Sequence, residues 1–205
     1  MQLPKNGVFL ISNHSTYLDS WVLSAAQTSS CEFATAVWHG VPKPVQYLAR
    51  PVIQVFDAGR NRQFLKQIRT QLKRRNVIVF PEGTFTDTLS GLLRFEKSVF
   101  ALKRPVYMVA VRYHRPLPFL QPLSLSTHPI WQTAVEMFQP WTTVDRIPLG
   151  RLVPAADESA QDLANRAQRS IAGALGLEAT HWTRHDRGKL LFAKHTPVTQ
   201  RNVDP

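Results

Sequence analysis

Cysteine and acidic residues are scarce in this chain, and long apolar runs are missing. The single cysteine, Cys31, cannot form an internal disulfide, and it excludes a cysteine-based metal site. This cysteine usage is typical of a reducing compartment. Uninterrupted apolar stretches such as Val106–Val111 are far shorter than the roughly 20 residues of a transmembrane helix. The sequence therefore predicts a globular domain without a membrane-spanning helix.

Positive charge dominates the composition. The chain has 25 lysines and arginines against 14 acidic residues, which gives a formal net charge of +11. Such a surface attracts polyanions, which include nucleic acids, anionic lipid headgroups and phosphorylated small molecules. The sequence has neither zinc-finger spacing nor an aromatic RNA-binding signature. We therefore expect no nucleic-acid partner, while charge alone does not choose between lipid headgroups and small molecules.

The length and the patterning indicate one folded domain. A chain of 205 residues can bury a substantial core, and 43% hydrophobic with 19% charged residues is a globular composition. After about Thr180 the chain becomes basic and loses its periodic pattern. We predict a domain over residues 1–180 and a basic, flexible tail over residues 181–205.

Apolar periodicity divides the domain into alternating strands and helices. Short apolar runs that end at turn residues predict buried strands, and helical spacing of apolar residues predicts amphipathic helices. The expected strands cover residues 8–12, 32–38, 52–56, 77–80, 105–111 and 143–153, and the expected helices begin near Thr16, Phe64 and Ser159. In the last helix, Ser159 and Asp162 form a capping pair and Gly176 is a stop signal. Alternating strands and helices predict an α/β fold with crossover connections.

Two stretches have a character suited to a membrane surface or to an anionic ligand. The helix that begins near Phe64 carries Lys66, Arg69 and Lys73 away from its apolar positions, which gives it a basic face. The second stretch contains an aromatic stripe of Trp131, Val135, Phe138 and Trp141. Such a stripe either enters a membrane interface or packs on its own domain. We predict packing in the core, because apolar helical spacing is primarily a burial signal.

The most informative feature is a histidine followed five positions later by an aspartate. His14 and Asp19 come shortly after the apolar run Val8–Ile11. A carboxylate that accepts one imidazole N–H leaves the other nitrogen free to take a proton from a hydroxyl, as in a general-base dyad. On one helix the two residues would lie about 140° apart, so they can meet only if His14 lies in the preceding turn and folds back. The alternatives are an ordinary loop histidine and an aspartate that completes a capping box begun by Thr16.

A second polar element follows the apolar run of residues 77–80. In this Pro-Glu-Gly-Thr turn, Glu82 supplies a carboxylate, and Gly83 permits an unusual backbone dihedral or close backbone approach. Thr84 adds a hydroxyl and a backbone N–H. Such a turn can bind the polar or phosphate part of a ligand. The alternative is an ordinary turn with a capping threonine.

Together the two elements resemble the glycerolipid and lysophospholipid acyltransferase superfamily. Residues 13–19 are similar to its H-x4-D block and residues 80–84 to its P-E-G-T block. The resemblance runs from about Val8 to Gly188 and looks nearest the branch of lysophosphatidylcholine acyltransferases and ancient ubiquitous protein 1. The pieces that carry the branch resemblance are residues 91–95, residues 174–177 and the stretch after Ser159. The resemblance implies a mixed, largely parallel sheet flanked by helices.

The resemblance also implies a role for each matching residue. His14 would be the general base on a glycerol hydroxyl, and Asp19 would orient its imidazole and stabilise its charge. The residues that would help to bind the acceptor are Glu82, Gly83 and Thr84. The donor would be acyl-CoA, which is a co-substrate, and no resident cofactor or metal is implied. His181 and His185 have helical ligand spacing but no third ligand, so we expect no metal there.

The chain departs from the family pattern at several positions. The family places an arginine near the end of the strand before the amphipathic helix, where it contacts the acceptor phosphate. Arg60 is the nearest candidate and Arg62 is an alternative, although the surrounding block matches poorly. Many relatives carry arginine directly after the Gly-Thr pair, where this chain has Phe85. A later strand that usually ends in proline has Ala110 instead.

We therefore predict an acyl-CoA-dependent O-acyltransferase of phospholipid biosynthesis. The acceptor would be a lysophospholipid or a glycerol phosphate at a membrane surface, and its hydroxyl would attack the thioester after His14 takes the proton. The protein would be membrane-associated with its site facing the cytoplasm, at the endoplasmic reticulum or lipid droplets in a eukaryote and at the inner membrane in a bacterium.

The rival hypothesis is a non-catalytic lipid-surface adaptor that keeps the acyltransferase scaffold. Phe85 and the poorly matching arginine block support it. A short distance between the His14 ring and the Asp19 carboxylate, on a cleft shared with Glu82 and Thr84, would favour the enzyme. Separation of the two side chains by the helix body would favour the adaptor.

Overall fold

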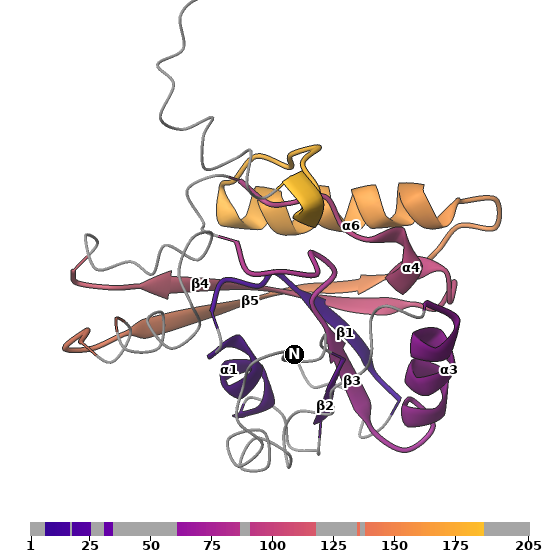
Figure 1. The fold of residues 1–205 in the computed structure, drawn as a ribbon, viewed down its shortest axis with the longest axis horizontal. Coiled ribbons are helices and arrows are strands. Elements are labelled where there is room, and N and C mark those ends of the chain that lie inside the picture. Colours follow the sequence, from indigo (N-terminus) through magenta and orange to yellow (C-terminus); the bar gives the residue numbers. More distant parts are fainter. Residues whose placement is uncertain are drawn as a thin grey trace, which may run out of the picture.

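Five strands form one sheet in the order β2-β3-β1-β4-β5. The computed structural model of the protein describes residues 7–16, 18–25, 31–34, 61–86, 91–117, 135 and 138–186. The strands are β1 (Phe9–Ser12), β2 (Cys31–Ala34), β3 (Asn76–Val79), β4 (Val106–His114) and β5 (Thr143–Leu152). The first four pair in parallel and β5 is antiparallel to β4 (Figure 1). The prediction of a mixed, largely parallel sheet is confirmed.

Helices cover both faces of this sheet. They are α1 (Asp19–Ala25), α3 (Asn61–Gln71), α4 (Lys97–Phe100), α6 (Ala160–Leu175) and the short 3-10 helix η2 (Arg184–Asp186). In Figure 1, α4 and α6 lie on one side of the sheet and α1 lies on the other. The three predicted helices are confirmed as α1, α3 and α6, whereas the single turn of α4 is too short to give a periodic signal.

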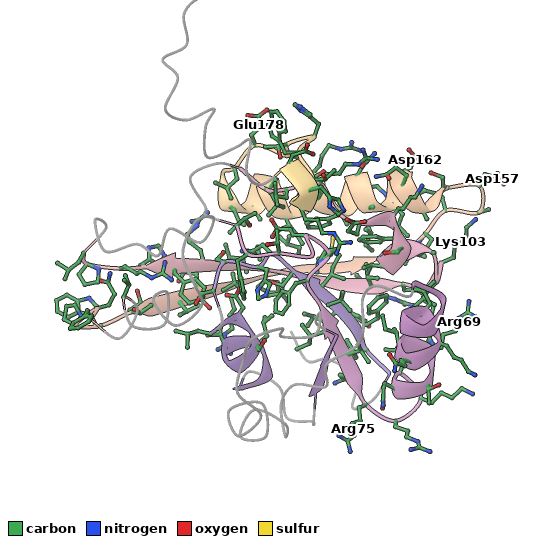
Figure 2. The ribbon with its side chains drawn as sticks, in the orientation of Figure 1. Arg69, Arg75, Lys103, Asp157, Asp162 and Glu178 are labelled. Carbon is green, nitrogen blue, oxygen red and sulfur yellow. The ribbon has the colours of Figure 1, made fainter. Side chains whose placement is uncertain are left out.

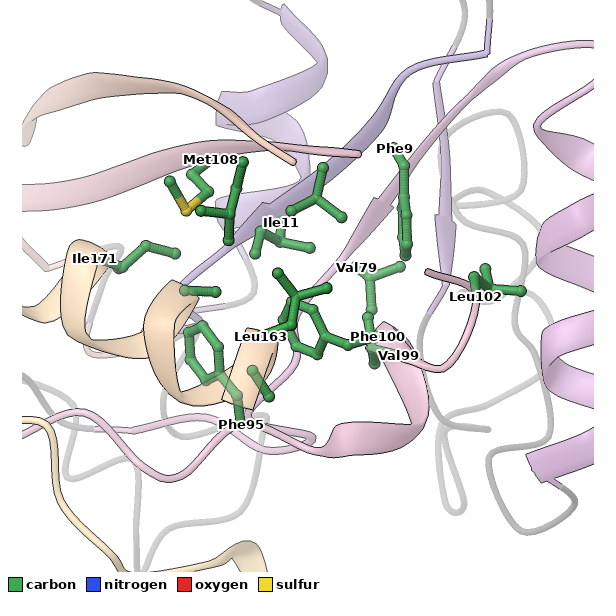
Figure 3. Close-up of a cluster of buried hydrophobic side chains, with 14 of the residues drawn as sticks. Phe9, Ile11, Val79, Phe95, Val99, Phe100, Leu102, Met108, Leu163 and Ile171 are labelled. Atoms are coloured by element: carbon green, nitrogen blue, oxygen red, sulfur yellow. The ribbon is translucent and has the colours of Figure 1, made fainter. Parts of the chain in front are cut away.

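Alternating side chains of the strands contribute to two hydrophobic clusters. In β1, Phe9 and Ile11 face the larger cluster, which also contains buried residues of α4 and α6 (Figure 3). Val8 and Leu10 face the smaller cluster, which contains Leu23 of α1. Because both faces of a parallel strand are covered, β1 appears in the sequence as a continuous apolar run without alternation.

The long helix α6 has the predicted ends. The hydroxyl oxygen of Ser159 accepts a hydrogen bond from the backbone N–H of Asp162 at 3.1 Å. Gly176 ends the helix in the left-handed conformation with φ of +69°. The buried side of the helix contains Leu163, Ala167 and Ile171, all of which belong to the larger cluster. Local capping signals and one apolar face therefore fixed this element.

The segment of residues 91–95 is held between α6 and the chain that follows it. Leu92 forms an isolated parallel bridge with Ala179, and the Gln168 side chain donates to the carbonyl oxygens of Leu92 and Thr180. The backbone N–H of Arg94 donates to the carbonyl oxygen of Trp182 at 2.8 Å. Contacts with the domain therefore continue beyond the predicted boundary at residue 180. The rest of the predicted tail, from residue 187, lies outside the described residues.

Two members of the aromatic stripe lie on the surface. Phe138 is 75% exposed and Trp141 is 64% exposed, so the prediction of core packing is wrong for both. They precede β5 at the end of the sheet where β4 and β5 extend beyond β1, so among the described strands β1 does not reach them. Trp131 and the expected strand at 52–56 lie outside the described residues. Within the described part of the chain, no helix combines the length and hydropathy needed to cross a membrane.

We predict that Gly91→Ala destabilises the domain, whereas Gly173→Ala stabilises it. Gly91 has φ of +87°, and a Cβ there would lie 2.7 Å from Thr180 Cγ2 and 2.8 Å from the Glu178 carbonyl oxygen. Backbone strain and the clash together should lower the free energy of unfolding by about 2–4 kcal/mol. Gly173 is helical, and a Cβ there meets nothing within 4 Å, so alanine should add about 0.5–1 kcal/mol. Urea unfolding measures both variants, and a neutral Gly91→Ala would contradict the described packing of residues 91–95.

Candidate active site

The candidate site is built where three neighbouring parallel strands end. Because β1 lies between β3 and β4 in the sheet, the residues that follow their carboxyl ends meet at one edge. His14 follows β1, Glu82 follows β3, and Tyr113 lies near the end of β4. The fold therefore brings together residues that are up to 99 positions apart, from His14 to Tyr113.

His14 and Asp19 are in direct contact. His14 lies in the turn after β1 and Asp19 is the first residue of α1, which is the arrangement that the helix geometry required. His14 Nδ1 is 2.8 Å from Asp19 Oδ2. Since an ionised carboxylate only accepts hydrogen bonds, the neutral imidazole carries its proton on Nδ1 and leaves Nε2 as the acceptor. The pair thus has the geometry of a histidine that an acid orients for proton transfer.

The Asp19 carboxylate is fully buried and accepts three further hydrogen bonds. Its Oδ2 accepts from the backbone N–H groups of Ser15 at 2.6 Å and Thr16 at 3.0 Å. Its Oδ1 accepts from the Tyr113 hydroxyl at 2.6 Å. The capping interaction considered from the sequence and the contact with His14 are therefore both present. These donors stabilise the charged form of a carboxylate that has no contact with solvent.

The Glu82 carboxyl group holds the backbone of His14. Its Oε1 accepts from the His14 N–H at 2.8 Å, and its Oε2 accepts from the Thr86 hydroxyl at 2.6 Å and the Leu93 N–H at 3.2 Å. The Thr86 N–H in turn donates to the His14 carbonyl oxygen at 2.8 Å. The sequence predicted that Glu82 binds the acceptor, but its side chain is fully buried and occupied by these partners. In the structure this carboxyl group holds the His14 backbone, and acceptor binding by Glu82 stays a prediction.

Burial raises the pKa of Glu82 to about 8. The hydrogen bonds from Thr86, His14 and Leu93 pull this pKa downward, and the nearby negative charge of Asp19 pushes it upward by a smaller amount. The carboxyl group is therefore mostly protonated at neutral pH.

Two phenylalanine rings enclose the imidazole. The Phe80 ring stacks on the His14 ring with centroids 3.9 Å apart and planes 8° apart. The Phe85 ring lies 4.1 Å away and is tilted by 44°. These contacts fix the orientation of the imidazole plane, while the hydrogen bond to Asp19 fixes the direction in which Nδ1 points within that plane. Phe85, which departs from the family pattern, therefore has a packing role at the centre of the site.

Asn13 attaches the turn that carries His14 to strand β4. Its side-chain Oδ1 accepts from the Val111 N–H at 2.8 Å, and its Nδ2 donates to the Val111 carbonyl oxygen at 2.9 Å. The side chain thereby takes the place of one more backbone residue in the β1–β4 ladder. The roles of Asn13, Thr86 and Tyr113 were missed in the sequence, because their contacts with Val111, His14 and Asp19 span 72 to 98 positions and no local pattern marks them.

The Gly83 turn is covered by an arginine from the end of the described chain. Gly83 is exposed with φ of +68°, and a Cβ there would lie 3.3 Å from Arg184 Cδ. Arg184 Nε lies 3.5 Å from Glu96 Oε1, and about a third of the Arg184 side chain is exposed. Thr84 is partly buried in the same turn. Arg184 thus brings a cation to the turn, while Arg60 lies outside the described residues.

Metal ligands do not gather at this site. Across the described segments, no three His, Cys, Asp or Glu side chains come together in a way that could hold a metal ion.

Comparison with known proteins gives one family. The model of the Acyltransferase family matches residues 1–114. The chain is 26% identical over 206 residues to the lipid droplet-regulating VLDL assembly factor AUP1 of Xenopus tropicalis, covering 96% of this chain and 48% of that protein. It is 28% identical over 212 residues to the glycerol-3-phosphate acyltransferase RAM2 of Petunia hybrida, covering 96% of this chain and 40% of that protein. The chain thus spans less than half the length of these curated relatives.

A solved structure shares the fold. The 1-acyl-sn-glycerophosphate acyltransferase PlsC from Thermotoga maritima superimposes with a TM-score of 0.57 at 15% sequence identity. The match covers 85% of this chain and 67% of that one. Together these matches support the superfamily that the H-x4-D and P-E-G-T blocks predicted, and the AUP1 similarity supports the branch that residues 91–95, residues 174–177 and the stretch after Ser159 indicated.

We predict that Glu82→Gln removes a pH dependence from the stability of the domain. The pKa of Glu82 is about 8 when folded and 4.5 as its ordinary value, so the folded state binds this proton more tightly. The contribution of Glu82 to the free energy of unfolding is therefore full below pH 4.5 and is lost as the pH rises to 8. The free energy of unfolding should fall by up to about 1.4 kcal/mol per pH unit in this range. Urea unfolding across this range should show the decline in the wild type and not in Glu82→Gln.

Glu158→Gln is the matched control for this measurement. The side chain of Glu158 is 12% exposed, and the hydrogen bond with Arg166 lowers the pKa of its carboxyl group. The contribution of Glu158 to stability is therefore lost only as the pH falls into the acid range. Between pH 5 and 8 this variant should keep the wild-type slope. A Glu82→Gln slope identical to the wild type would contradict a protonated Glu82 in the folded state.

Proposed function

Because this chain belongs to the acyltransferase family, we propose that it transfers an acyl group from acyl-CoA to the hydroxyl of a lysophospholipid or a glycerol phosphate. The contact of 2.8 Å between His14 Nδ1 and Asp19 Oδ2 carries this proposal. The names of RAM2 and of PlsC, both acyltransferases for glycerol phosphates, support the acceptor class. These names bear on the acceptor alone, and acyl-CoA is the donor that we propose.

The proposed reaction needs one proton acceptor and no covalent intermediate. His14 Nε2 takes the proton of the acceptor hydroxyl as its oxygen attacks the thioester carbonyl carbon. The tetrahedral intermediate collapses, the C–S bond breaks, and the new ester is released with the thiolate, which receives the proton from the imidazolium. Asp19 stabilises the positive imidazole that exists between these two steps. Because the thiolate is a good leaving group, Cys31 at the start of β2 needs no role.

The phosphate of the acceptor needs a cation near the reacting hydroxyl. Arg184 is a described cation at the Gly83 turn, and Phe85, two residues further on, contacts the His14 ring. Arginine binds phosphate through two parallel charge-assisted hydrogen bonds. We therefore assign Arg184, together with the Gly83–Thr84 turn, to the acceptor phosphate.

A lipid-surface adaptor is the second candidate function. The names of the AUP1 relatives, which are lipid droplet-regulating VLDL assembly factors, favour it. These names also support a place on a lipid droplet or membrane, and we propose that the site faces the cytoplasm. An adaptor would keep the scaffold but would transfer no acyl group. Purified protein with labelled acyl-CoA and a panel of lysolipids separates the two functions, because product formation above background excludes the adaptor.

We predict that His14→Ala lowers the turnover number by about 10²–10⁴, which is the usual contribution of a positioned general base. His114→Ala is the matched control, because His114 Nε2 lies 2.7 Å from Asp145 Oδ2 in a second His–Asp pair that is about half exposed. With a short-chain, water-soluble acceptor, the control should keep wild-type turnover. Circular dichroism checks that both variants are folded. Equal turnover for His14→Ala and the wild type would reject the general base.

We predict that Arg184→Ala raises the KM for a phosphate-bearing acceptor by about tenfold and changes kcat little, because one charge-assisted contact is lost. The KM for a monoacylglycerol, which has no phosphate, should stay the same. Arg69→Ala on α3 is the control for a general loss of positive charge, because Arg69 is exposed. An equal change in KM for both acceptors would show that Arg184 has only a structural role.

A further inference from the structure

Exposed apolar side chains gather at the end of the sheet that carries the candidate site. Among the described residues, the large hydrophobic side chains that are more than a third exposed are Leu18, Phe138, Trp141 and Val153. Leu18 directly precedes Asp19, and Trp141 lies two positions before β5 begins. Val153 follows the opposite end of β5. Three of the four therefore lie at one end of the molecule, and the fourth lies away from them.

Strands β4 and β5 form an arm at this end. Strand β4 pairs with β1 only as far as Val109, but it pairs with β5 as far as His114. Residues 110–114 therefore extend beyond β1 by roughly 17 Å, at about 3.4 Å per residue, and Figure 1 shows this two-stranded extension. The Tyr113 hydroxyl donates to Asp19 from within the arm. The arm is therefore attached to the site and continues past it.

The end of the arm is held in a defined shape. The Gln139 side chain accepts from the Leu117 N–H at 3.2 Å and donates to the Leu117 carbonyl oxygen at 3.0 Å. This pair of bonds joins the chain that leaves β4 to the chain that approaches β5. Gln139 is buried, while its neighbour Phe138 is 75% exposed. The exposed aromatic side chains thus stand on a fixed support.

Two arginines belong to the same arm, Arg115 directly after β4 and Arg146 within β5. The Arg115 guanidinium lies 4.8 Å from the centroid of the Tyr113 ring. Arg146 Nη1 donates to the carbonyl oxygen of Val22 in α1 at 3.5 Å, so it lies on the α1 face of the sheet, as the site does. Asp145 is the opposing charge and is paired with His114. Exposed aromatic rings beside arginines are the combination that proteins use at the headgroup layer of a bilayer.

We propose that the end of the β4–β5 arm docks on an anionic phospholipid bilayer. Phe138 and Trp141 enter the interfacial layer, and Arg115 and Arg146 face the headgroups. The docked arm holds His14 at the bilayer surface, so a lipid acceptor reaches the site without leaving the membrane. The identity of that acceptor rests on the proposed function, whereas docking itself requires no catalysis.

The basic face of α3 is the competing membrane surface. Lys66, Arg69 and Lys73 are exposed, but α3 leads into the amino end of β3, away from the site. Figure 2 shows Arg69 and Arg75 far from the end of the arm. In the described residues no large exposed hydrophobic side chain accompanies them. This face can add long-range attraction, but it offers no side chain for insertion.

Vesicle flotation with the 205-residue chain tests the proposal. The vesicles contain phosphatidylcholine with about 30% phosphatidylserine, to supply the anionic surface. The double variant Phe138→Ser with Trp141→Ser should lower the partition coefficient by about tenfold or more, because two aromatic side chains no longer insert. Val153→Ser removes an exposed hydrophobic side chain from the other end of β5 and should bind like the wild type. Both variants should unfold at the wild-type temperature, because these side chains are not in the core.

Several results would overturn the docking surface. The wild type could fail to bind the vesicles, or the double variant could bind them as well as the wild type. Vesicle binding could also fall equally in Val153→Ser, or fall only when Lys66, Arg69 and Lys73 are neutralised. Light scattering could also show that the wild type is a dimer and the double variant a monomer, with equal vesicle binding. That result would assign the aromatic side chains to self-association instead.

The docking surface and the proposed function can fail separately. If the wild type binds vesicles through the arm but acylates no lysolipid, the proposed function fails and the docking surface stands. If it acylates a soluble acceptor while binding is independent of the arm, the docking surface alone fails.

Discussion

A buried carboxylate with four hydrogen-bond donors organises this end of the protein. Asp19 has no exposed surface, so its charge is stable only because the turn after β1 and the Tyr113 hydroxyl donate to it. The same bonds join the start of α1 to the far end of β4. The imidazole of His14 completes this arrangement. The imidazole of His14, the start of α1 and the end of β4 therefore share one buried carboxylate.

The site has two buried acids with different protonation and different tasks. Asp19 is surrounded by donors and orients the His14 ring, whereas burial keeps Glu82 largely protonated and its carboxyl group holds the His14 backbone. Phe80 and Phe85 restrict the plane of the ring between them. Different neighbours of His14 therefore fix its backbone, the direction of its ring nitrogens and the plane of its ring. A base that is fixed before the substrate arrives loses little entropy in the reaction.

The position of the site also suits a lipid acceptor. The carboxyl ends of the parallel strands present His14 on the α1 face, and the β4–β5 arm carries exposed aromatic side chains past it. The curated relatives include both a glycerol-3-phosphate acyltransferase and lipid droplet factors. A scaffold that stands on a lipid surface serves either role, and the proton-transfer geometry of His14 and Asp19 is the feature that an adaptor would not need.

Sequence alone determined the features that depend on near neighbours. The apolar runs predicted the strands, Ser159 and Gly176 predicted the ends of α6, and a spacing of five positions allowed His14 and Asp19 to meet within one turn. Only the tertiary structure decided which residues complete the site. Tyr113 reaches Asp19 across 94 positions and Glu82 reaches the His14 backbone across 68. The reason is physical: capping and periodicity act within a few residues, whereas these contacts exist only after β3, β1 and β4 have paired side by side.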